Sequence, residues 1–147
     1  MDWVEGTLKV RGDKSDIKKF LIGAIESVDE KECLITEDEN EIVVRLPDKS
    51  ERFYVKNSYR NFIYGSKIVW DKVCEVLLIP GYHGPASIDT KHLAALSAEY
   101  NVDLKILAYL QGIEYSIDFE VHKGKIIKEE EATDEDYIWE CPHYYDC

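Results

Sequence analysis

The sequence predicts a single α+β domain in which an antiparallel sheet carries two helices on one face and an extra hairpin at its C-terminal end. Three observations predict this class: apolar and polar residues alternate in several segments, apolar residues recur at helical spacing in two others, and turn-forming residues separate them. The chain has 147 residues, a length at which one domain buries about two thirds of its unfolded surface. We expect this domain to span residues 1–128 and an acidic, aromatic tail to span residues 129–147.

The N-terminal segment predicts a strand followed by a helix. Between Trp3 and Arg11 apolar residues alternate with polar ones, so one face of the strand is expected in the core. Gly12 and Asp13 end the strand, and Asp13 or Ser15 can cap the following helix. The apolar residues at helical spacing are Ile17, Phe20, Leu21, Ala24, Ile25 and Val28.

The middle of the chain predicts an antiparallel meander of short strands. The strands are expected at residues 33–36, 42–46 and 53–56, with an acidic turn at 37–40 and a second turn at 47–50. Each turn contains residues that favour a reversal of the chain, so consecutive strands are expected to pair.

The next segment is less regular. Residues 57–71 are aromatic and fit neither the helical nor the strand period. Residues 73–79 are mostly apolar and predict a strand that ends at Pro80 and Gly81. The stretch G-Y-H-G-P that begins at Gly81 is expected to be a loop, either functional or a simple turn.

The second half predicts a helix and three strands. The helix is expected at residues 88–101 with Asp89 as its cap, and the strands at residues 104–110, 113–121 and 125–128. A tight turn at Lys123-Gly124 joins the last two strands. The element order is the ferredoxin-like α+β plan, with an extended antiparallel sheet and both helices on one face.

The charge of the chain limits its partners. It has 30 Asp and Glu against 18 Lys and Arg, a net charge of −12. Affinity for a phosphate backbone depends on clustered Lys and Arg, so we expect no direct nucleic-acid binding. A negative charge favours solubility, attraction to basic protein surfaces, or imitation of nucleic acid. The candidate partner-binding residues are Glu37, Asp38, Glu39 and Glu41, together with Glu129, Glu130, Glu131, Asp134, Glu135 and Asp136.

The expected location is the cytoplasm. No run approaches the about 20 apolar residues of a membrane span, so no membrane partner is expected. The residues after Met1 lack the basic and apolar regions of a secretory signal. Cys33 precedes an apolar residue and Cys74 follows one. Both are expected to be buried free thiols.

No strong catalytic motif is present, and we expect no enzyme, no catalytic residue and no cofactor. The G-x-S-x-G elbow, the P-loop and the G-x-G-x-x-G fingerprint are all missing from the sequence. An enzyme would most simply use His83 as a general base with Glu75 or Asp89 as its partner.

A metal site is not expected either. Cys141, His143 and Cys147 are residue types that zinc prefers, but their spacing supplies only three ligands and lacks the usual cysteine pair.

Four stretches of the chain resemble the YubB-like (Api92-like) ferredoxin-fold family. They are the first strand, Y-G-S-K-I-V-W-D at 64–71, P-G-Y-H-G-P-A at 80–86 and L-S-A-E-Y-N-V-D-L-K-I-L-A-Y at 96–109. Family members typically open with a W-x-x-x-x-L-x-V-x-G strand and carry W-G-T-K-W-D, where this chain has Tyr64 in place of Trp and two inserted residues before Trp70. The resemblance implies a ferredoxin-like fold and an origin on plasmids, phages or other mobile elements. It implies no established activity.

Together these observations predict a small, non-enzymatic, acidic protein of a bacterial mobile element or prophage that binds another protein through its acidic surface and a sheet edge. In its most specific form this protein is a DNA mimic, which needs a continuous stripe of carboxylates. One alternative is a homo-oligomer that associates through strand edges or its tail. Another is a small-molecule or metal-dependent enzyme.

Overall fold

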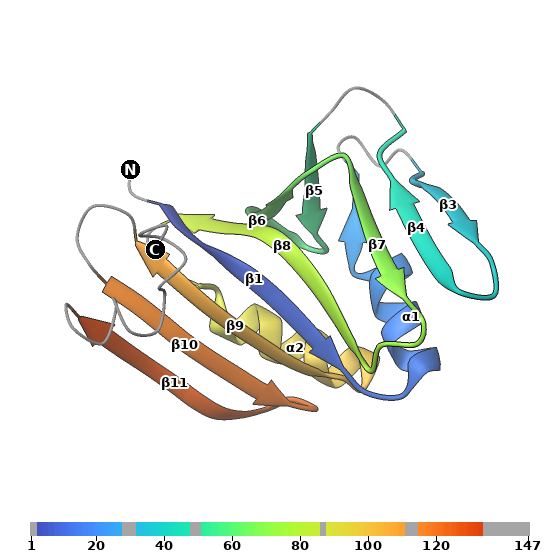
Figure 1. Ribbon diagram of the computed structural model, residues 1–147. Coiled ribbons are helices and arrows are strands. Elements are labelled where there is room, and N and C mark those ends of the chain that lie inside the picture. Colours follow the sequence, from blue (N-terminus) through green and yellow to red (C-terminus); the bar gives the residue numbers. More distant parts are fainter. Residues whose placement is uncertain (1–2, 28–31, 48–50, 86–87, 111–114, 134–147) are drawn as a thin grey trace, which may run out of the picture.

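The computed structural model describes residues 3–27, 32–47, 51–85, 88–110 and 115–133 (Figure 1). These residues form eleven strands and two helices. The strands are β1 (Trp3–Arg11), β2 (Ile25–Glu26), β3 (Leu34–Glu37), β4 (Glu41–Arg45), β5 (Arg52–Val55), β6 (Ser58–Tyr64), β7 (Lys67–Asp71), β8 (Val76–Pro85), β9 (Asp103–Leu110), β10 (Tyr115–His122) and β11 (Lys125–Thr133). The helices are α1 (Lys14–Gly23) and α2 (Thr90–Tyr100).

The described part of the chain is mostly β, so the predicted ferredoxin-like α+β class is wrong. Eight strands form one sheet in the order β11-β10-β9-β1-β8-β6-β5-β2, and three form a second sheet in the order β3-β4-β7. All of the pairings in both sheets are antiparallel.

Two segments contain more strand than the sequence predicted. Residues 57–71, which showed no clear period, form β6 and β7. Asn57 adopts a positive φ of 63°, which lets the chain reverse tightly between β5 and β6. Gly81, at φ 84°, lies where the register between β1 and β8 shifts, so β8 continues to Pro85 instead of ending in the predicted loop. Glycine adopts the positive φ of such a bulge without strain, whereas most other residues do not.

The helices lie close to their predicted positions. Asp89 caps α2 as expected, because its Oδ1 accepts a hydrogen bond of 3.2 Å from the backbone N–H of His92. The α1 helix ends at Gly23, earlier than its apolar spacing predicted, and Ile25 already belongs to β2. The hydroxyphenyl ring of Tyr100 lies directly against Gly23 and leaves no room for a larger side chain there.

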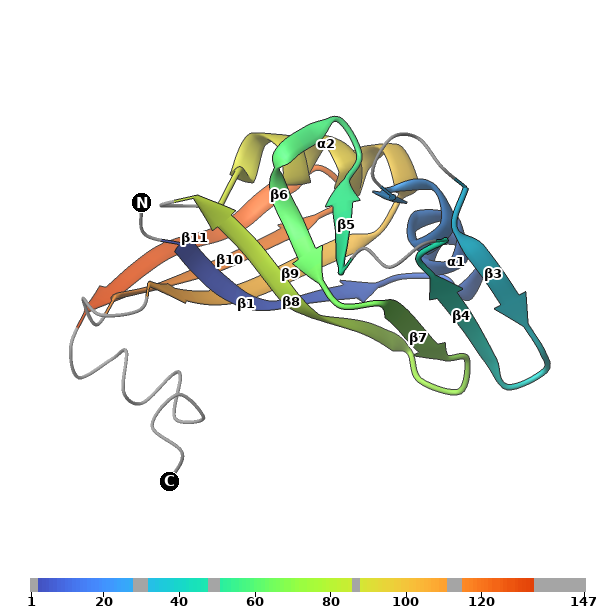
Figure 2. The same ribbon diagram turned by 90° about the horizontal axis from the view of Figure 1, so that it is seen from above.

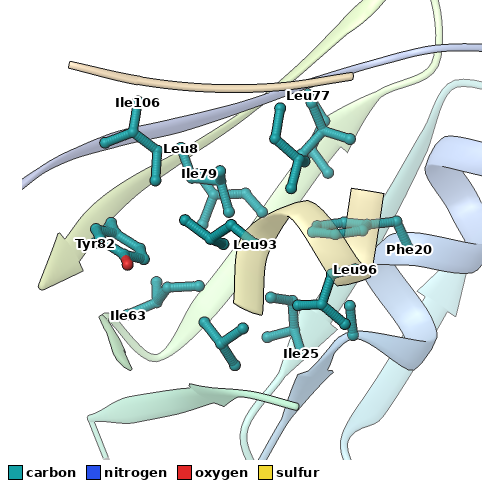
Figure 3. Close-up of a cluster of buried hydrophobic side chains, with 14 of the residues drawn as sticks. Leu8, Phe20, Ile25, Ile63, Leu77, Ile79, Tyr82, Leu93, Leu96 and Ile106 are labelled. Carbon is teal, nitrogen blue, oxygen red and sulfur yellow. The ribbon is translucent and has the colours of Figure 1, made fainter. Parts of the chain in front are cut away.

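The core lies between the sheet and the helices. Figures 1 and 2 show α1 and α2 on the same side of β1, β8 and β9. Leu8 and Ile106 from the sheet, Leu93 from α2 and Phe20 from α1 are fully buried in one cluster (Figure 3). The alternation that predicted an inward face for β1 is confirmed, since its buried residues are Val4, Leu8 and Val10. Neither of the two described helices lies on the opposite side of the sheet.

Candidate functional site

The first predicted acidic group lies at the β3–β4 hairpin, and Glu37 there has a structural role. Its carboxylate contacts the Nζ of Lys18 at 2.7 Å and the Nζ of Lys72 at 2.6 Å. The hydrogen bonds from Lys18 and Lys72 lower the pKa of Glu37 below its ordinary value. Glu37 is therefore neutralised by its own chain.

Asp38 stabilises the hairpin turn. Its Oδ1 accepts backbone hydrogen bonds from Glu41 at 2.8 Å and from Asn40 at 2.7 Å, and these bonds lower the pKa of the Asp38 carboxyl. Glu39 and Glu41 are exposed. The hairpin thus offers a partner fewer free carboxylates than its sequence indicates.

The second acidic group lies on β11. Glu129, Glu130 and Glu131 are exposed on this strand, which continues to Thr133 and so carries the sheet past the expected boundary at residue 128. Asp134, Glu135 and Asp136 fall outside the described residues.

The two acidic groups are far apart. The β11 strand is the first strand of the large sheet, whereas β3 and β4 belong to the second sheet, and Figure 1 shows them at opposite ends of the molecule. The described residues of the two groups do not form the continuous stripe of carboxylates that a DNA mimic requires.

The structure brings together a different group on the side of the sheet without helices, here called the open face. Its central residues are Glu5, Thr7 and Lys9 of β1, His83 of β8, and Lys105, Leu107 and Tyr109 of β9. They alternate along their strands with residues of the core, and the register places Glu5 between His83 and Tyr109.

His83 pairs with Glu5, and not with Glu75 or Asp89 as expected for an enzyme. Its Nε2 lies 3.0 Å from Glu5 Oε2, and its Nδ1 lies 2.7 Å from the backbone oxygen of Gly81. Because the carbonyl oxygen can only accept, Nδ1 donates to Gly81. Nε2 faces the carboxyl of Glu5, so both ring nitrogens of His83 have partners within the protein.

An aromatic group fixes the His83 ring. The imidazole stacks on Phe62 with ring centroids 5.4 Å apart and an interplanar angle of 4°, and it meets the edge of Tyr64 at 4.6 Å. The Arg52 guanidinium lies 4.8 Å from the Phe62 centroid, and Trp3 packs edge to face on Phe62 at 5.2 Å. Contacts of this kind each stabilise by about 0.5–1.5 kcal/mol, so the ring is held before any ligand binds.

A hollow of about 460 Å³ lies beside this pair on the open face. Its lining residues are Glu5, Gly6, Thr7, Lys9, Gly81, His83, Lys105, Leu107 and Tyr109. The volume is within the range of about 300–1,000 Å³ that is usual for small-molecule sites.

A row of ion pairs crosses β9, β10 and β11 next to the hollow. Lys105 Nζ contacts Asp118 at 3.3 Å and Glu120 at 3.2 Å, and Lys128 Nζ contacts Asp118 at 2.6 Å. Burial alone raises the pKa of the Asp118 carboxyl, but Lys128 and Lys105 together lower it below its ordinary value. Asp118 is thus the centre of a small charge network.

This network predicts a measurable loss of stability in acid. A carboxyl with a lowered pKa stabilises the folded state above its unfolded pKa of about 3.9, and this contribution disappears as the pH falls through the lower, folded-state pKa. We expect Asp118→Asn to lower the melting temperature at pH 7 and to reduce the further loss between pH 7 and pH 3. Glu129→Gln, at a position without a described ion pair, is the control and should melt like the parent protein. Equal acid sensitivity in the Asp118→Asn variant and the parent would contradict the assignment.

The cysteine predictions are partly wrong. Cys33 is half-buried, and burial raises the pKa of its thiol. Cys74 is exposed, because it lies in the turn between β7 and β8, where its N–H donates to the backbone oxygen of Asp71 at 2.9 Å.

The described residues contain no group of three or more His, Cys, Asp or Glu side chains placed to hold a metal ion. Cys141, His143 and Cys147 lie outside these residues. Neither α1 nor α2 combines the length and the apolar composition needed to cross a membrane.

The comparisons with known proteins give no match: no family model, no curated protein and no solved structure is significantly similar to this chain. The resemblance to the YubB-like family therefore stays a prediction. Sequence reasoning singled out the stretch that contains His83 but missed Glu5, which lies 78 residues away along the chain. The only local signal of Glu5 was its place among the polar residues that alternate along β1.

Proposed function

We propose that this protein is a non-enzymatic binding domain that takes up an extended, basic segment of a partner protein along β11. One observation carries the proposal: β11 is the end strand of the eight-stranded sheet, and it presents Glu129, Glu130 and Glu131 to solvent. No described strand pairs with its outer side.

The geometry of an end strand supports this mode of binding. Its outer N–H and C=O groups are available to hydrogen-bond a further strand, which gives affinity without dependence on sequence. Ile126 and Ile127 are 38% and 48% exposed and add apolar contact area. The three carboxylates supply selectivity, because they repel an acidic strand and attract a basic one.

The proposal places the protein in the cytoplasm. Cys33 and Cys74 are free thiols, and an exposed free thiol such as Cys74 is compatible with a reducing compartment.

The test uses a fluorescent peptide of alternating valine and lysine residues and a matched peptide with glutamate in place of lysine. We expect the basic peptide to bind and the acidic one not to bind. Replacing Glu129, Glu130 and Glu131 together by lysine should weaken binding at least about tenfold, which corresponds to about 1.4 kcal/mol. Fluorescence anisotropy at low and high salt measures the affinity.

Two controls separate pairing at β11 from general charge attraction. The Glu39→Lys, Glu41→Lys variant removes exposed carboxylates at the other end of the molecule and should bind as the parent does. Amide hydrogen exchange should slow in residues 125–133 when the peptide binds. Equal weakening by both variants, or unchanged exchange in β11, would refute the proposed site.

A second candidate function is self-association through the same strand. Lys125 and Lys128 lie in the first half of β11 and the three glutamates in the second half. In an antiparallel pairing of two copies, the basic half of one strand therefore meets the acidic half of the other. Light scattering over a range of concentrations tests this: a dimer supports self-association, and a monomer throughout excludes it.

A further inference from the structure

We propose that the hollow on the open face is a binding site for a small organic monocarboxylate. This site is separate from the β11 edge, so it does not depend on the function proposed above. The inference rests on the shape of the hollow, on its charge balance and on the rigidity of its His83–Glu5 end.

The shape follows from the backbone between β1 and β8. The register of these strands shifts between Gly6 and Leu8, opposite the bulge at Gly81. Gly81 and the short side chain of Thr7 both line the depression at this point. Its volume of about 460 Å³ suits a molecule of a few tens of atoms or fewer.

The charge balance leaves one positive charge without a partner. Lys9 of β1 and Lys105 of β9 stand directly opposite one another, and like charges at such positions repel. Lys105 is compensated by Asp118 and Glu120, whereas Lys9 has no ion-pair partner among the described residues. Glu5 is engaged by His83, so a single negative charge from a ligand would complete the site at Lys9.

This balance selects the chemical class of the ligand. A monoanion matches the one uncompensated ammonium group of Lys9, whereas a dianion would also face the field of a chain with a net charge of −12. Leu107 and Tyr109 form the side of the hollow on β9 and offer an apolar and an aromatic surface to the body of the ligand. An organic carboxylate combines both features.

The other end of the hollow is preorganised. His83 is held by Glu5, by the carbonyl oxygen of Gly81 and by stacking on Phe62. A ligand that packs against this end therefore orders few additional side chains, which favours affinity.

The experiment titrates the full chain with benzoate, acetate and inorganic phosphate in low-salt buffer and follows the amide resonances by NMR. Benzoate is expected to bind saturably with shifts that are largest at residues 5–9 and 105–109. Acetate should bind more weakly because it lacks the ring. Phosphate, titrated against benzoate at pH 8, should bind more weakly because it is largely a dianion at that pH. Absence of saturable shifts, or tighter binding of phosphate than of benzoate, would overturn the proposal.

Lys9→Gln is the decisive variant, and Lys67→Gln, at an exposed lysine of β7 without a described ion pair, is its matched control. Lys9→Gln should weaken benzoate binding by at least about tenfold, while Lys67→Gln should leave it unchanged. Without ligand, Lys9→Gln should also melt at a higher temperature than the parent, because it removes the repulsion from Lys105. An unchanged benzoate affinity or a lower melting temperature in this variant would contradict the charge argument.

Discussion

Phe20→Ala is expected to destabilise the protein by about 3–5 kcal/mol, the usual cost of removing a large side chain from a core. Phe20 is completely buried and packs edge to face on Tyr100, with ring centroids 5.7 Å apart. The ring joins α1 to α2 and to the sheet, so its loss leaves a cavity at the point where three elements meet (Figure 3). Urea unfolding followed by circular dichroism measures the change in the free energy of unfolding.

Ile22→Ala is the matched control for this prediction. Ile22 lies on the same helix, two residues from Phe20, but is 41% exposed. Its replacement should change the stability by much less than that of Phe20. A similar loss in both variants would contradict the burial of Phe20 and the exposure of Ile22 on α1.

Gly6→Ala is the second large effect, with an expected cost of about 3 kcal/mol or more. A Cβ atom on Gly6 would lie well inside van der Waals contact with the backbone oxygen of Leu107 and at 3.0 Å from the Cα of Ala108. Both atoms belong to the backbone of β9, so relief requires β1 and β9 to move apart in the centre of the sheet. Overpacking of this kind outweighs the small gain of about 0.5–1 kcal/mol that alanine usually brings to a strand.

Gly12→Ala provides the comparison. A Cβ at Gly12 would first meet the side-chain Cγ1 of Val102 at 3.3 Å, a contact that a small side-chain shift relieves. We expect this variant to keep a melting temperature close to that of the parent. If Gly6→Ala and Gly12→Ala proved equally stable in thermal unfolding, the tight approach of β1 to β9 would be refuted.

The sequence predicted the local elements well where one periodicity was clear. The alternation in Trp3–Arg11 marks β1 with its correct inward face, and the helical spacing after Asp13 and the cap at Asp89 mark the two helices. The prediction failed at residues 57–71 and after Ile79, where strands contain turn-forming residues. Their conformation depends on pairing with distant strands, which local propensity does not describe.

The candidate site was also only partly predictable from the sequence. The amino-acid sequence showed that Glu37 and Asp38 are acidic, but it could not show that Lys18, Lys72 and the hairpin backbone already satisfy them. It marked His83 as unusual without revealing Glu5 as its partner.

The sequence by itself determined the charge of the chain, the faces of its most regular strands and helices, and the absence of familiar catalytic motifs. Those properties depend on residue types and on spacing over a few positions. Only the tertiary structure decided that β1 lies between β8 and β9, which places Lys9 opposite Lys105 and Glu5 beside His83. The physical reason is that strand pairing joins residues far apart in the chain, and the register that buries the core also selects which polar side chains meet on the open face.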